Sequence, residues 1–381
     1  MQIYLDNAAS SCPKPPGVID AVDQCLREWC ANPGRGAHKT AVAAARVIYR
    51  TREKAAGLLN VADSANIIFT QNATDSLNMA MRGLLSPGDH VVSSTVEHNA
   101  VVRPLRVLTG EGVEVTLVPS DPTGLVDADA VLAAVRASTK LVILTHASNI
   151  TGAIQPIPEL SLALKERGVP LLVDAAQSAG TIPLDMEAMP VSLLACTGHK
   201  SLMGPQGIGI LYISPDIELR SVRQGGTGTH SEAAQDTLAR PDRYEAGTLN
   251  TPGIAGLGAG IDFLQGEGIE NLGRHKAELT EVLYEGLSSI GGVTLYGPPP
   301  GAPRGPLVAF NVGEMPSSEV AGILDSRYEI ASRAGIHCAP GAHQAMGTLK
   351  RGAVRLSIGP FNTREEIETA ITAVEEIAAG A

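Results

Sequence analysis

A regular alternation of short apolar runs with helical patterns constrains the fold of this chain more than any other feature of its sequence. The runs are rich in Val, Ile and Leu without polar alternation, which is typical of strands buried on both faces of a parallel sheet. Helical segments such as residues 127–138 and 158–167 separate them, so the sequence predicts βαβ units. The predicted strands are residues 65–70, 90–94, 113–119, 140–145, 169–174, 190–197 and 207–213.

The pattern changes after residue 262. A long helical stretch at residues 269–290 leads into a Gly/Pro-rich loop at residues 297–306. Two apolar runs and two helical segments follow, at residues 307–312, 317–326 and 354–358 and from Thr363 onward. We therefore predict an α/β protein with a large domain at residues 16–262 and a smaller α+β domain at residues 263–381. Residues 1–15 form an N-terminal segment that joins the two.

Composition and charge narrow the class of protein. Hydrophobic residues make up 44% of the chain and charged residues 18%, as in a globular protein with a large core. The formal net charge is −11 and no basic run occurs, so we expect no nucleic-acid partner. No stretch reaches the roughly 18 apolar residues of a membrane span, and the first residues lack the features of a secretory signal. We expect a cytoplasmic enzyme without a membrane partner.

The cysteines argue against a disulfide framework. Their number is odd and no CxxC pair occurs, so we expect neither disulfides nor a closed zinc site. Cys196 and His199 resemble half of a metal site, but no second half with matching spacing follows, so we predict no metal. Most of the five are expected to be small buried hydrophobic residues: Cys12, Cys25, Cys30, Cys196 and Cys338.

An acidic and a basic residue follow two of the predicted strands. Asp174 ends the strand at residues 169–174, and Lys200 follows the strand at residues 190–197. Ligands collect at the carboxyl ends of parallel strands. The pair suits pyridoxal phosphate, because a lysine can bind the aldehyde of that cofactor while a carboxylate pairs with its pyridinium nitrogen. An ion pair between two loops explains these two residues equally well.

A phosphate group would need hydrogen-bond donors close to Lys200. Thr74 stands in the first turn of the helix that follows residues 65–70, and Thr197 and His199 flank the lysine. By itself Thr74 is better explained as an ordinary helix N-cap.

Two further polar residues follow predicted strands. His98 comes shortly after residues 90–94, where it could lie on a cofactor ring, move protons or cap a helix. Asn149 follows residues 140–145. Five strand ends that meet at one edge of the sheet would each carry a polar residue, which chance does not easily explain. These residues are Thr74, His98, Asn149, Asp174 and Lys200.

A cysteine and an arginine distinguish the smaller domain. Cys338 follows His337 in the Gly- and Pro-containing stretch at residues 333–341, which predicts an accessible loop and a neighbour able to lower the pKa of the thiol. A buried loop thiol is a slightly better explanation from the sequence alone. Arg355 stands inside the apolar strand at residues 354–358, where it could bind a substrate carboxylate or pair with an Asp or Glu.

Taken in order, these motifs resemble the class V aminotransferase superfamily of fold-type I pyridoxal-phosphate enzymes. The resemblance is closest to the cysteine desulfurases of group II, which overlap with the selenocysteine lyases. It covers nearly the whole chain, and TGHK with an upstream DAAQ is its most specific part. The matching motifs are YLDNAAS, EHNA, THASNITG, DAAQ, TGHK, EAGTLN, RAGIHCAPG and VRLSIGPFNT.

The resemblance implies the PLP-dependent transferase fold type I, with a mainly parallel seven-stranded sheet between helices in the large domain. It implies that Lys200 holds the cofactor, that Asp174 pairs with the pyridine nitrogen and that Gln177 contacts the phenolic oxygen. His98 would stack on the ring and transfer protons. The implied phosphate ligands are Ala73, Thr74, Thr197 and His199, joined by Thr248 from a second subunit of a homodimer.

The resemblance also implies the reaction. Cys338 would accept sulfur from L-cysteine, which leaves L-alanine, and a sulfur-acceptor protein in iron–sulfur cluster or thio-cofactor assembly would receive it. Asn149, Arg333 and Arg355 would bind the substrate. The alternatives are a selenocysteine lyase, another class V aminotransferase or epimerase in which Cys338 is not catalytic, and a non-catalytic scaffold.

Two stretches depart from the group II pattern. The RQGGTGTHSE stretch contains residues 225–232 and lacks the longer run of glycines, and the segment after Cys338 carries an additional histidine, His343. Both are expected near the active-site entrance, so they bear on the identity of the substrate and of the acceptor.

Overall fold

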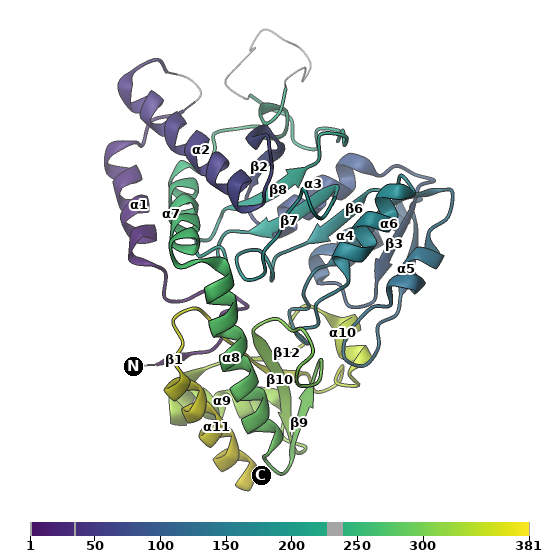
Figure 1. Ribbon diagram of the computed structural model, residues 1–381, viewed down its shortest axis with the longest axis vertical. Coiled ribbons are helices and arrows are strands. Elements are labelled where there is room, and N and C mark those ends of the chain that lie inside the picture. Colours follow the sequence, from purple (N-terminus) through teal and green to yellow (C-terminus); the bar gives the residue numbers. More distant parts are fainter. Residues whose placement is uncertain (1, 34–35, 227–238, 381) are drawn as a thin grey trace.

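A seven-stranded sheet forms the upper half of the molecule in Figure 1. The structure is a computed structural model that describes residues 2–33, 36–226 and 239–380. Strand β8 runs antiparallel to both of its neighbours and the other pairs are parallel, which confirms the predicted mainly parallel sheet. The strand order is β2 (Ile67–Thr70), β8 (Gly209–Ile213), β7 (Leu193–Thr197), β6 (Leu171–Asp174), β5 (Thr139–Thr145), β3 (His90–Ser94) and β4 (Glu114–Val118).

The sheet separates two hydrophobic cores, because alternate residues of each strand point to opposite faces. Ile68 packs into one core with α3 (Ala73–Leu84) and α4 (Asn99–Gly110). Ile67 packs into the other core, which the remaining helices around the sheet cover. These helices are α2 (Lys39–Leu58), α5 (Ala128–Ala134), α6 (Ile157–Glu166) and α7 (Thr251–Glu267).

Strand β4 departs from the expected burial on both faces. It lies at the edge of the sheet and pairs only with β3, and Leu117 is half exposed. The prediction of a strand buried on both faces is wrong for β4, whereas β2 at the opposite edge of the sheet is buried throughout.

A four-stranded antiparallel sheet forms the lower half of the molecule (Figure 1). Its order is β12 (Arg333–Gly335), β13 (Ala353–Ser357), β10 (Leu307–Val312) and β9 (Val293–Tyr296). A third hydrophobic core joins this sheet to α8 (Ile269–Ser288), α9 (Ser317–Tyr328) and α11 (Arg364–Ala379). Strands and helices therefore mix here in the α+β manner that the sequence predicts.

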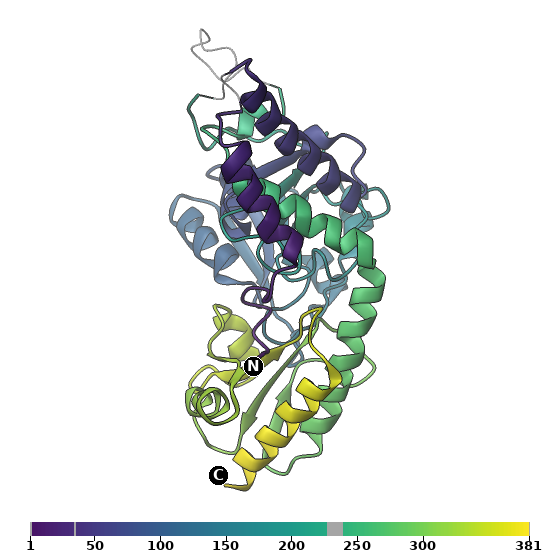
Figure 2. The ribbon, with the colours of Figure 1, turned by 90° about the vertical axis from the view of Figure 1, so that its left-hand side faces the viewer.

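Helices α7 and α8 connect the two halves. Helix α1 (Pro16–Glu28) and α2 pack on α7, and Figure 2 shows α8 descending from α7 along the lower half beside α11. The predicted boundary between residues 262 and 263 falls inside α7 and stays a prediction.

The N-terminal segment crosses from one half to the other. Strand β1 (Ile3–Tyr4) pairs with β11 (Ile330–Ala331) of the lower half. The backbone N–H of Ser11 then donates to the carbonyl of His199 in the upper half, at 3.0 Å. Residues 5–10 therefore lie between the two halves.

The stretch at residues 333–341 is more ordered than the predicted loop. It begins with strand β12, which pairs with β13, and it ends in the short helix α10 (Pro340–Ala345). Proline stands at the first helical position of α10, where its missing N–H costs nothing. Cys338 lies on the short turn between these two elements.

Within the described residues, no helix is long and apolar enough to cross a membrane.

Candidate active site

A cavity of about 320 Å³ lies between the carboxyl ends of the parallel strands and the lower half of the molecule. Its size is within the usual range of small-molecule sites. It brings together all of the predicted site residues except Thr248: Ala73, Thr74, His98, Asn149, Asp174, Gln177, Thr197, His199, Lys200, Arg333, Cys338 and Arg355.

Lys200 lies on the turn after β7, with its amine deep in the protein. Burial lowers the pKa of this lysine to about 8, partly offset by the nearby carboxylate of Asp174. A substantial fraction of the amine is therefore neutral near pH 8, and a neutral amine is a nucleophile and a base.

Asp174 ends β6 and is buried beside the lysine. Its carboxylate accepts a hydrogen bond from the backbone N–H of Ala176 at 2.9 Å. Burial nevertheless raises the pKa of Asp174, because an ionised carboxylate is poorly solvated there. A cationic group placed against this carboxylate would stabilise its ionised form.

His98 caps a helix, which confirms one of the predicted possibilities, and it also lines the cavity. Its Nδ1 accepts a hydrogen bond from the backbone N–H of Ala100 at 3.0 Å. Burial and the charge of Lys200 lower the pKa of His98 to about 4. The ring is therefore neutral at physiological pH and carries its proton on Nε2.

The first turn of α3 forms one wall of the cavity. Asn72 is the N-cap of this helix, since its side chain accepts from the backbone N–H of Asp75 at 3.0 Å. The interpretation of Thr74 as the N-cap is therefore wrong, and Thr74 lines the cavity instead. Gly209 allows the close approach of β8, because a Cβ at this position would lie 2.7 Å from the backbone of Asn72.

Two buried polar atoms near this wall have no hydrogen-bond partner, Oγ1 of Thr197 and Nδ1 of His199. Buried polar groups are usually satisfied, and such exceptions occur where a ligand binds. Together with the start of α3, these atoms suit an anionic group such as a phosphate.

Arg355 lines the cavity and pairs with Asp6 of the N-terminal segment. Its Nη2 donates to Oδ1 of Asp6 at 2.7 Å and its Nη1 to the carbonyl of Asn149 at 2.8 Å. Nε of this buried side chain has no partner. The predicted pairing with a carboxylate is confirmed, and one edge of the guanidinium still carries an unpartnered donor.

Cys338 is exposed, so the interpretation as a buried loop thiol is wrong. The neighbouring His337 carries no positive charge. Burial and the charge of Arg355 lower the pKa of His337 to about 3, so the ring is neutral. Both of its nitrogens are occupied, at 3.4 Å by Nε2 of His343 and at 3.4 Å by the carbonyl of Arg333.

The five cysteines divide differently from the expectation that most are buried. Cys25 and Cys196 are buried, whereas Cys12, Cys30 and Cys338 are exposed. Apolar neighbours in the sequence do not bury a thiol on a helix end or on a turn.

No group of three His, Cys, Asp or Glu side chains able to hold a metal occurs among the described residues.

Thr248 lies away from this cavity. It is exposed and lines a second cavity of about 570 Å³ on the side of α2, with Tyr49 among its neighbours. Its Oγ1 accepts a hydrogen bond from the side chain of Asn32 at 3.1 Å. The chain by itself therefore does not bring Thr248 to Lys200.

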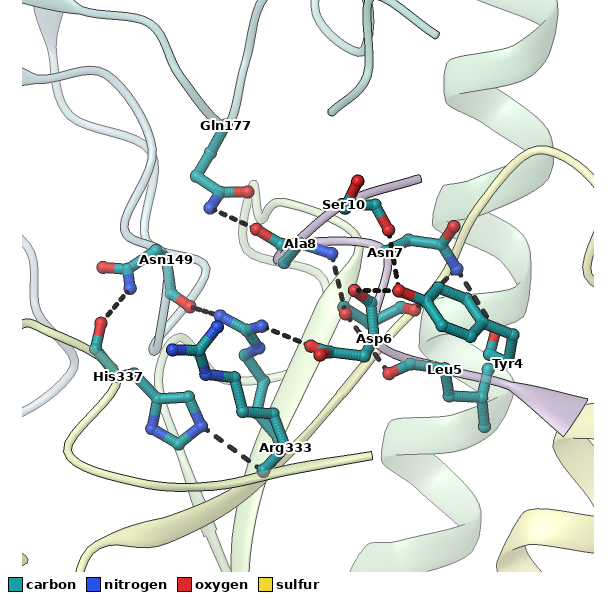
Figure 3. A network of polar contacts seen from close by, with 12 residues as sticks. Tyr4, Leu5, Asp6, Asn7, Ala8, Ser10, Asn149, Gln177, Arg333 and His337 are labelled. Atoms are coloured by element: carbon teal, nitrogen blue, oxygen red, sulfur yellow. Dashed lines mark hydrogen bonds and ion pairs between the residues drawn. The ribbon is translucent and has the colours of Figure 1, made fainter. Parts of the chain in front are cut away.

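The N-terminal segment contributes two residues beyond the predicted site residues, Asp6 and Ala8. Asp6 holds Arg355, and the carbonyl of Ala8 accepts a hydrogen bond from Nε2 of Gln177 at 3.0 Å (Figure 3). Only the YLDNAAS motif signals these contacts in the sequence.

Of the unusual stretch at residues 225–232, positions 227–232 lie outside the described residues.

The residues of the cavity fit pyridoxal phosphate. A buried lysine with a lowered pKa suits its aldehyde, and a buried carboxylate suits a pyridinium nitrogen. The unpartnered hydroxyl of Thr197 and ring nitrogen of His199 suit its phosphate.

The comparisons with known proteins agree with this fold and this site. The sequence model of the aminotransferase class-V family matches residues 3–369. The chain therefore belongs to the class V aminotransferase family.

Relatives within that family narrow the assignment. A probable cysteine desulfurase from Methanothermobacter thermautotrophicus is 39% identical over 383 aligned residues, which cover 99% of this chain and 94% of the relative. A cysteine desulfurase from Serratia proteamaculans is 34% identical, with 98% of this chain and 93% of the relative covered.

Solved structures give the same result. The apo structure of a cysteine desulfurase from Thermococcus onnurineus has a TM-score of 0.94 and 33% identity and covers 100% of this chain and 95% of that one. A cysteine desulfurase from Escherichia coli has a TM-score of 0.89 and 29% identity, with the same coverage. Within its family, the chain therefore belongs with the cysteine desulfurases, whose fold is PLP-dependent transferase fold type I.

Proposed function

We propose that the protein removes sulfur from L-cysteine, releases L-alanine and carries the sulfur as a persulfide on Cys338, with pyridoxal phosphate bound to Lys200. One observation carries the proposal. The exposed Cys338 and Lys200, whose amine is buried, line the same cavity, although they come from different halves of the molecule. A class V aminotransferase or epimerase in which Cys338 is not catalytic would not need a thiol at this point.

Pyridoxal phosphate supplies an electron sink for the carbon next to the amino group of a bound amino acid. Lys200 would hold the cofactor aldehyde until the amino group of the substrate displaces it, and the freed amine, whose pKa is about 8 without the cofactor, would then accept the Cα proton. Asp174 would pair with the pyridinium nitrogen, and Gln177 would contact the phenolic oxygen. Ala73, Thr74, Thr197 and His199 surround the phosphate.

Arg355 is the residue best placed to bind the carboxylate of the substrate. Its Nε donor is unpartnered, while Asp6 and the carbonyl of Asn149 hold the rest of the guanidinium in place. Arg333 adds a second positive charge to the same wall. A substrate that enters with its carboxylate toward these arginines leaves its sulfur free to approach Cys338.

Sulfur transfer is a displacement at the sulfur atom of the substrate. The Cys338 thiolate forms a new S–S bond while the Cβ–S bond of the substrate breaks, and the carbon keeps the electron pair and takes up a proton. The proton of the substrate thiol stays on the outer sulfur of the persulfide, and the neutral His98 offers the cavity a hydrogen-bond donor at Nε2, because its Nδ1 already accepts from Ala100. The products are L-alanine and the Cys338 persulfide.

The persulfide must then leave the enzyme. We propose that a sulfur-acceptor protein takes it for iron–sulfur cluster or thio-cofactor assembly in the cytoplasm. Turnover without an acceptor is expected to be slow. L-selenocysteine is the alternative substrate, since the same displacement would occur at selenium.

The experiment that tests the proposal compares the wild type with Cys338→Ser. Alanine and sulfide released from L-cysteine are measured under a reductant, with Cys30→Ser as the control, because Cys30 is also exposed but does not line the cavity. We expect equal amounts of alanine and sulfide from the wild type and the control, and neither product from Cys338→Ser. Activity that survives in Cys338→Ser would reject the persulfide route.

We further propose a homodimer in which Thr248 reaches the phosphate site of the other subunit. Two observations support it. Thr248 is exposed and lies outside the cavity of its own chain. The same side exposes large apolar side chains on α1 and α2, with Ile19 at 63%, Leu26 at 56% and Tyr49 at 61% exposure, as is typical of a surface that a partner covers.

A mixing experiment tests the dimer. Lys200→Ala and Thr248→Ala subunits are unfolded together in equal amounts, refolded with cofactor and assayed. If Thr248 acts across the interface, each mixed dimer regains one intact site, so activity rises to about a quarter of the wild type. If Thr248 acts within its own chain, mixing restores nothing.

A further inference from the structure

Two buried histidines lie directly behind the turn that carries Cys338. His337 and His343 are 4% and 0% exposed, and their rings stack at 5.6 Å between centroids with 9° between planes. Nε2 of His343 lies 3.4 Å from Nδ1 of His337, and Nδ1 of His343 lies 2.7 Å from Oγ1 of Thr348. Neither His343 nor Thr348 lines the cavity, so the reaction proposed above leaves this cluster without a role.

The hydrogen bonds of the cluster allow one arrangement of protons when both rings are neutral. Nε2 of His337 faces the carbonyl of Arg333, which only accepts, so this nitrogen must donate. Nδ1 of His337 is then an acceptor, and Nε2 of His343 must donate to it. Nδ1 of His343 accepts in turn, so the hydroxyl of Thr348 donates to it.

Neutral rings agree with their surroundings. Burial lowers the pKa of His343 to about 4. For His337 the charged neighbours are Arg355 and Arg333, which add to the effect of burial. A positive charge on either ring would therefore be unfavourable.

The backbone of the turn needs such support. His337 and Cys338 both have positive φ angles, 51° and 58°, in the left-handed region that non-glycine residues rarely adopt. Two consecutive residues of this kind persist only where contacts hold them. Two such contacts come from the half of the molecule with the seven-stranded sheet. Nδ2 of Asn149 donates to the carbonyl of His337 at 2.7 Å, and the backbone N–H of Asn99 donates to the carbonyl of Cys338 at 2.7 Å.

We propose that His343 and Thr348 are positioning residues for the Cys338 thiol. Through a single chain of donated protons, they fix the tautomer and orientation of His337, and the fixed ring holds the two left-handed residues that direct Sγ into the cavity. His337 then acts as a buried support and not as the base of the thiol. The inference rests on the proposed function and names further residues that serve it.

The test compares three variants of the holoenzyme. His343→Leu removes both hydrogen bonds, Thr348→Val removes only the donor hydroxyl at nearly constant volume, and Thr348→Ser restores a hydroxyl. The matched control is His90→Leu, because His90 is also buried with both ring nitrogens on threonine hydroxyls, those of Thr139 and Thr116, but it lies at the far end of β3.

Two readouts are needed. The first is the rate of alanine formation at varied L-cysteine, and the second is alkylation of individual cysteines by iodoacetamide, followed by mass spectrometry. Because a misplaced group costs about ten- to a hundredfold in rate, His343→Leu is expected to lower kcat by at least about tenfold with KM little changed. Alkylation of Cys338 is expected to rise, by about threefold or more, as the turn loosens.

The outcomes separate positioning from unfolding. The buried Cys25 and Cys196 stay unreactive toward iodoacetamide if His343→Leu remains folded. If they react, Thr348→Val is the variant that tests the inference. In Thr348→Val we expect a smaller fall in kcat and a smaller rise in the alkylation of Cys338, and we expect Thr348→Ser to reverse both. Variants that match His90→Leu in both readouts would overturn the inference. If the wild type releases no alanine from L-cysteine, the proposed function fails, and the alkylation of Cys338 still tests the positioning role.

Discussion

At the scale of single residues, burial sets the chemistry of the site. Lys200 loses its solvation, so its pKa falls to about 8, and Asp174 shows the opposite shift for the same reason. His98 is neutral with its proton on Nε2, because the helix that it caps occupies Nδ1. Each of these states depends on the folded surroundings and not on the residue type.

The lowered pKa of Lys200 predicts how the apoprotein takes up pyridoxal phosphate. Only the neutral amine attacks an aldehyde, so the rate constant should rise with pH up to about 8 and level off above it. The measurement is the absorbance change after mixing apoprotein and cofactor between pH 6.5 and 9.5. A rate that is still rising at pH 9.5 would mean an ordinary lysine.

Arg355 should act on substrate binding. Arg355→Lys loses the planar guanidinium and its hydrogen bonds to Asp6 and Asn149, and charged hydrogen bonds contribute about 1.5–3 kcal/mol each. We expect kcat/KM for L-cysteine to fall roughly tenfold to hundredfold, mainly through KM. The control is Arg327→Lys on the exposed face of α9, which should behave as the wild type.

At the scale of elements, the short helix α10 shows how closely the two halves approach each other near Cys338. A Cβ on Gly341 would lie 1.8 Å from the backbone oxygen of Thr95, so only glycine fits there. The glycines and proline of this stretch predict a loop. The turn is instead fixed between β12 and α10, and Gly341 allows α10 to pack against the half of the molecule that contains the seven-stranded sheet.

Gly341→Ala is therefore expected to displace α10 and with it the Cys338 turn. The free energy of unfolding should fall by about 1–3 kcal/mol, since overpacking costs this much, and alanine formation should fall with it. Gly322→Ala is the matched control, because Gly322 lies in helix α9 with no atom within 4 Å of the new Cβ. That variant should gain about 0.5–1 kcal/mol in stability. Thermal or urea unfolding measures both, and equal stability of the two variants would contradict the close approach.

At the scale of the whole molecule, buried histidines make stability depend on pH. His146, His337 and His343 have pKa values lowered by burial to about 4, 3 and 4. They stay neutral in the folded protein but take up protons in the unfolded chain below a pH of about 6.5. Stability that is present above pH 6.5 is therefore lost as the pH falls toward 4.

Buried carboxyls act in the opposite direction. Burial raises the pKa of Glu97 to about 8, so its contribution to the free energy of unfolding falls as the pH rises from about 4.5 to 8. His98 and His199, whose pKa values are also lowered to about 4, act in the same direction as these three histidines, and Glu245 acts in the same direction as Glu97. We therefore expect maximal stability near pH 6.5. Urea unfolding of the holoenzyme between pH 4.5 and 8.5 measures the profile. His343→Gln should reduce the acid-side slope by up to about 1.4 kcal/mol per pH unit, and an unchanged slope would place a protonated His343 in the folded protein.

Several parts of this molecule follow from the sequence alone. Apolar runs without polar alternation identify strands buried on both faces, and parallel strands necessarily bring their carboxyl ends to one edge. For this reason the places of Asp174 and Lys200 in the sequence, each at the end of a strand, are enough to predict that the two lie together. The prediction failed at β4, because the sequence of a strand does not report how much of that strand the rest of the chain covers.

Only the tertiary structure decided the contacts between segments far apart in the chain. Asp6 holds Arg355, and Asn149 binds the carbonyl of His337, whereas Thr248 lies outside the cavity of its own chain. Apolar periodicity reports which face of an element is buried, because burial repeats with the geometry of that element. It carries no information on which distant polar groups meet, because those contacts depend on how the two halves pack against each other.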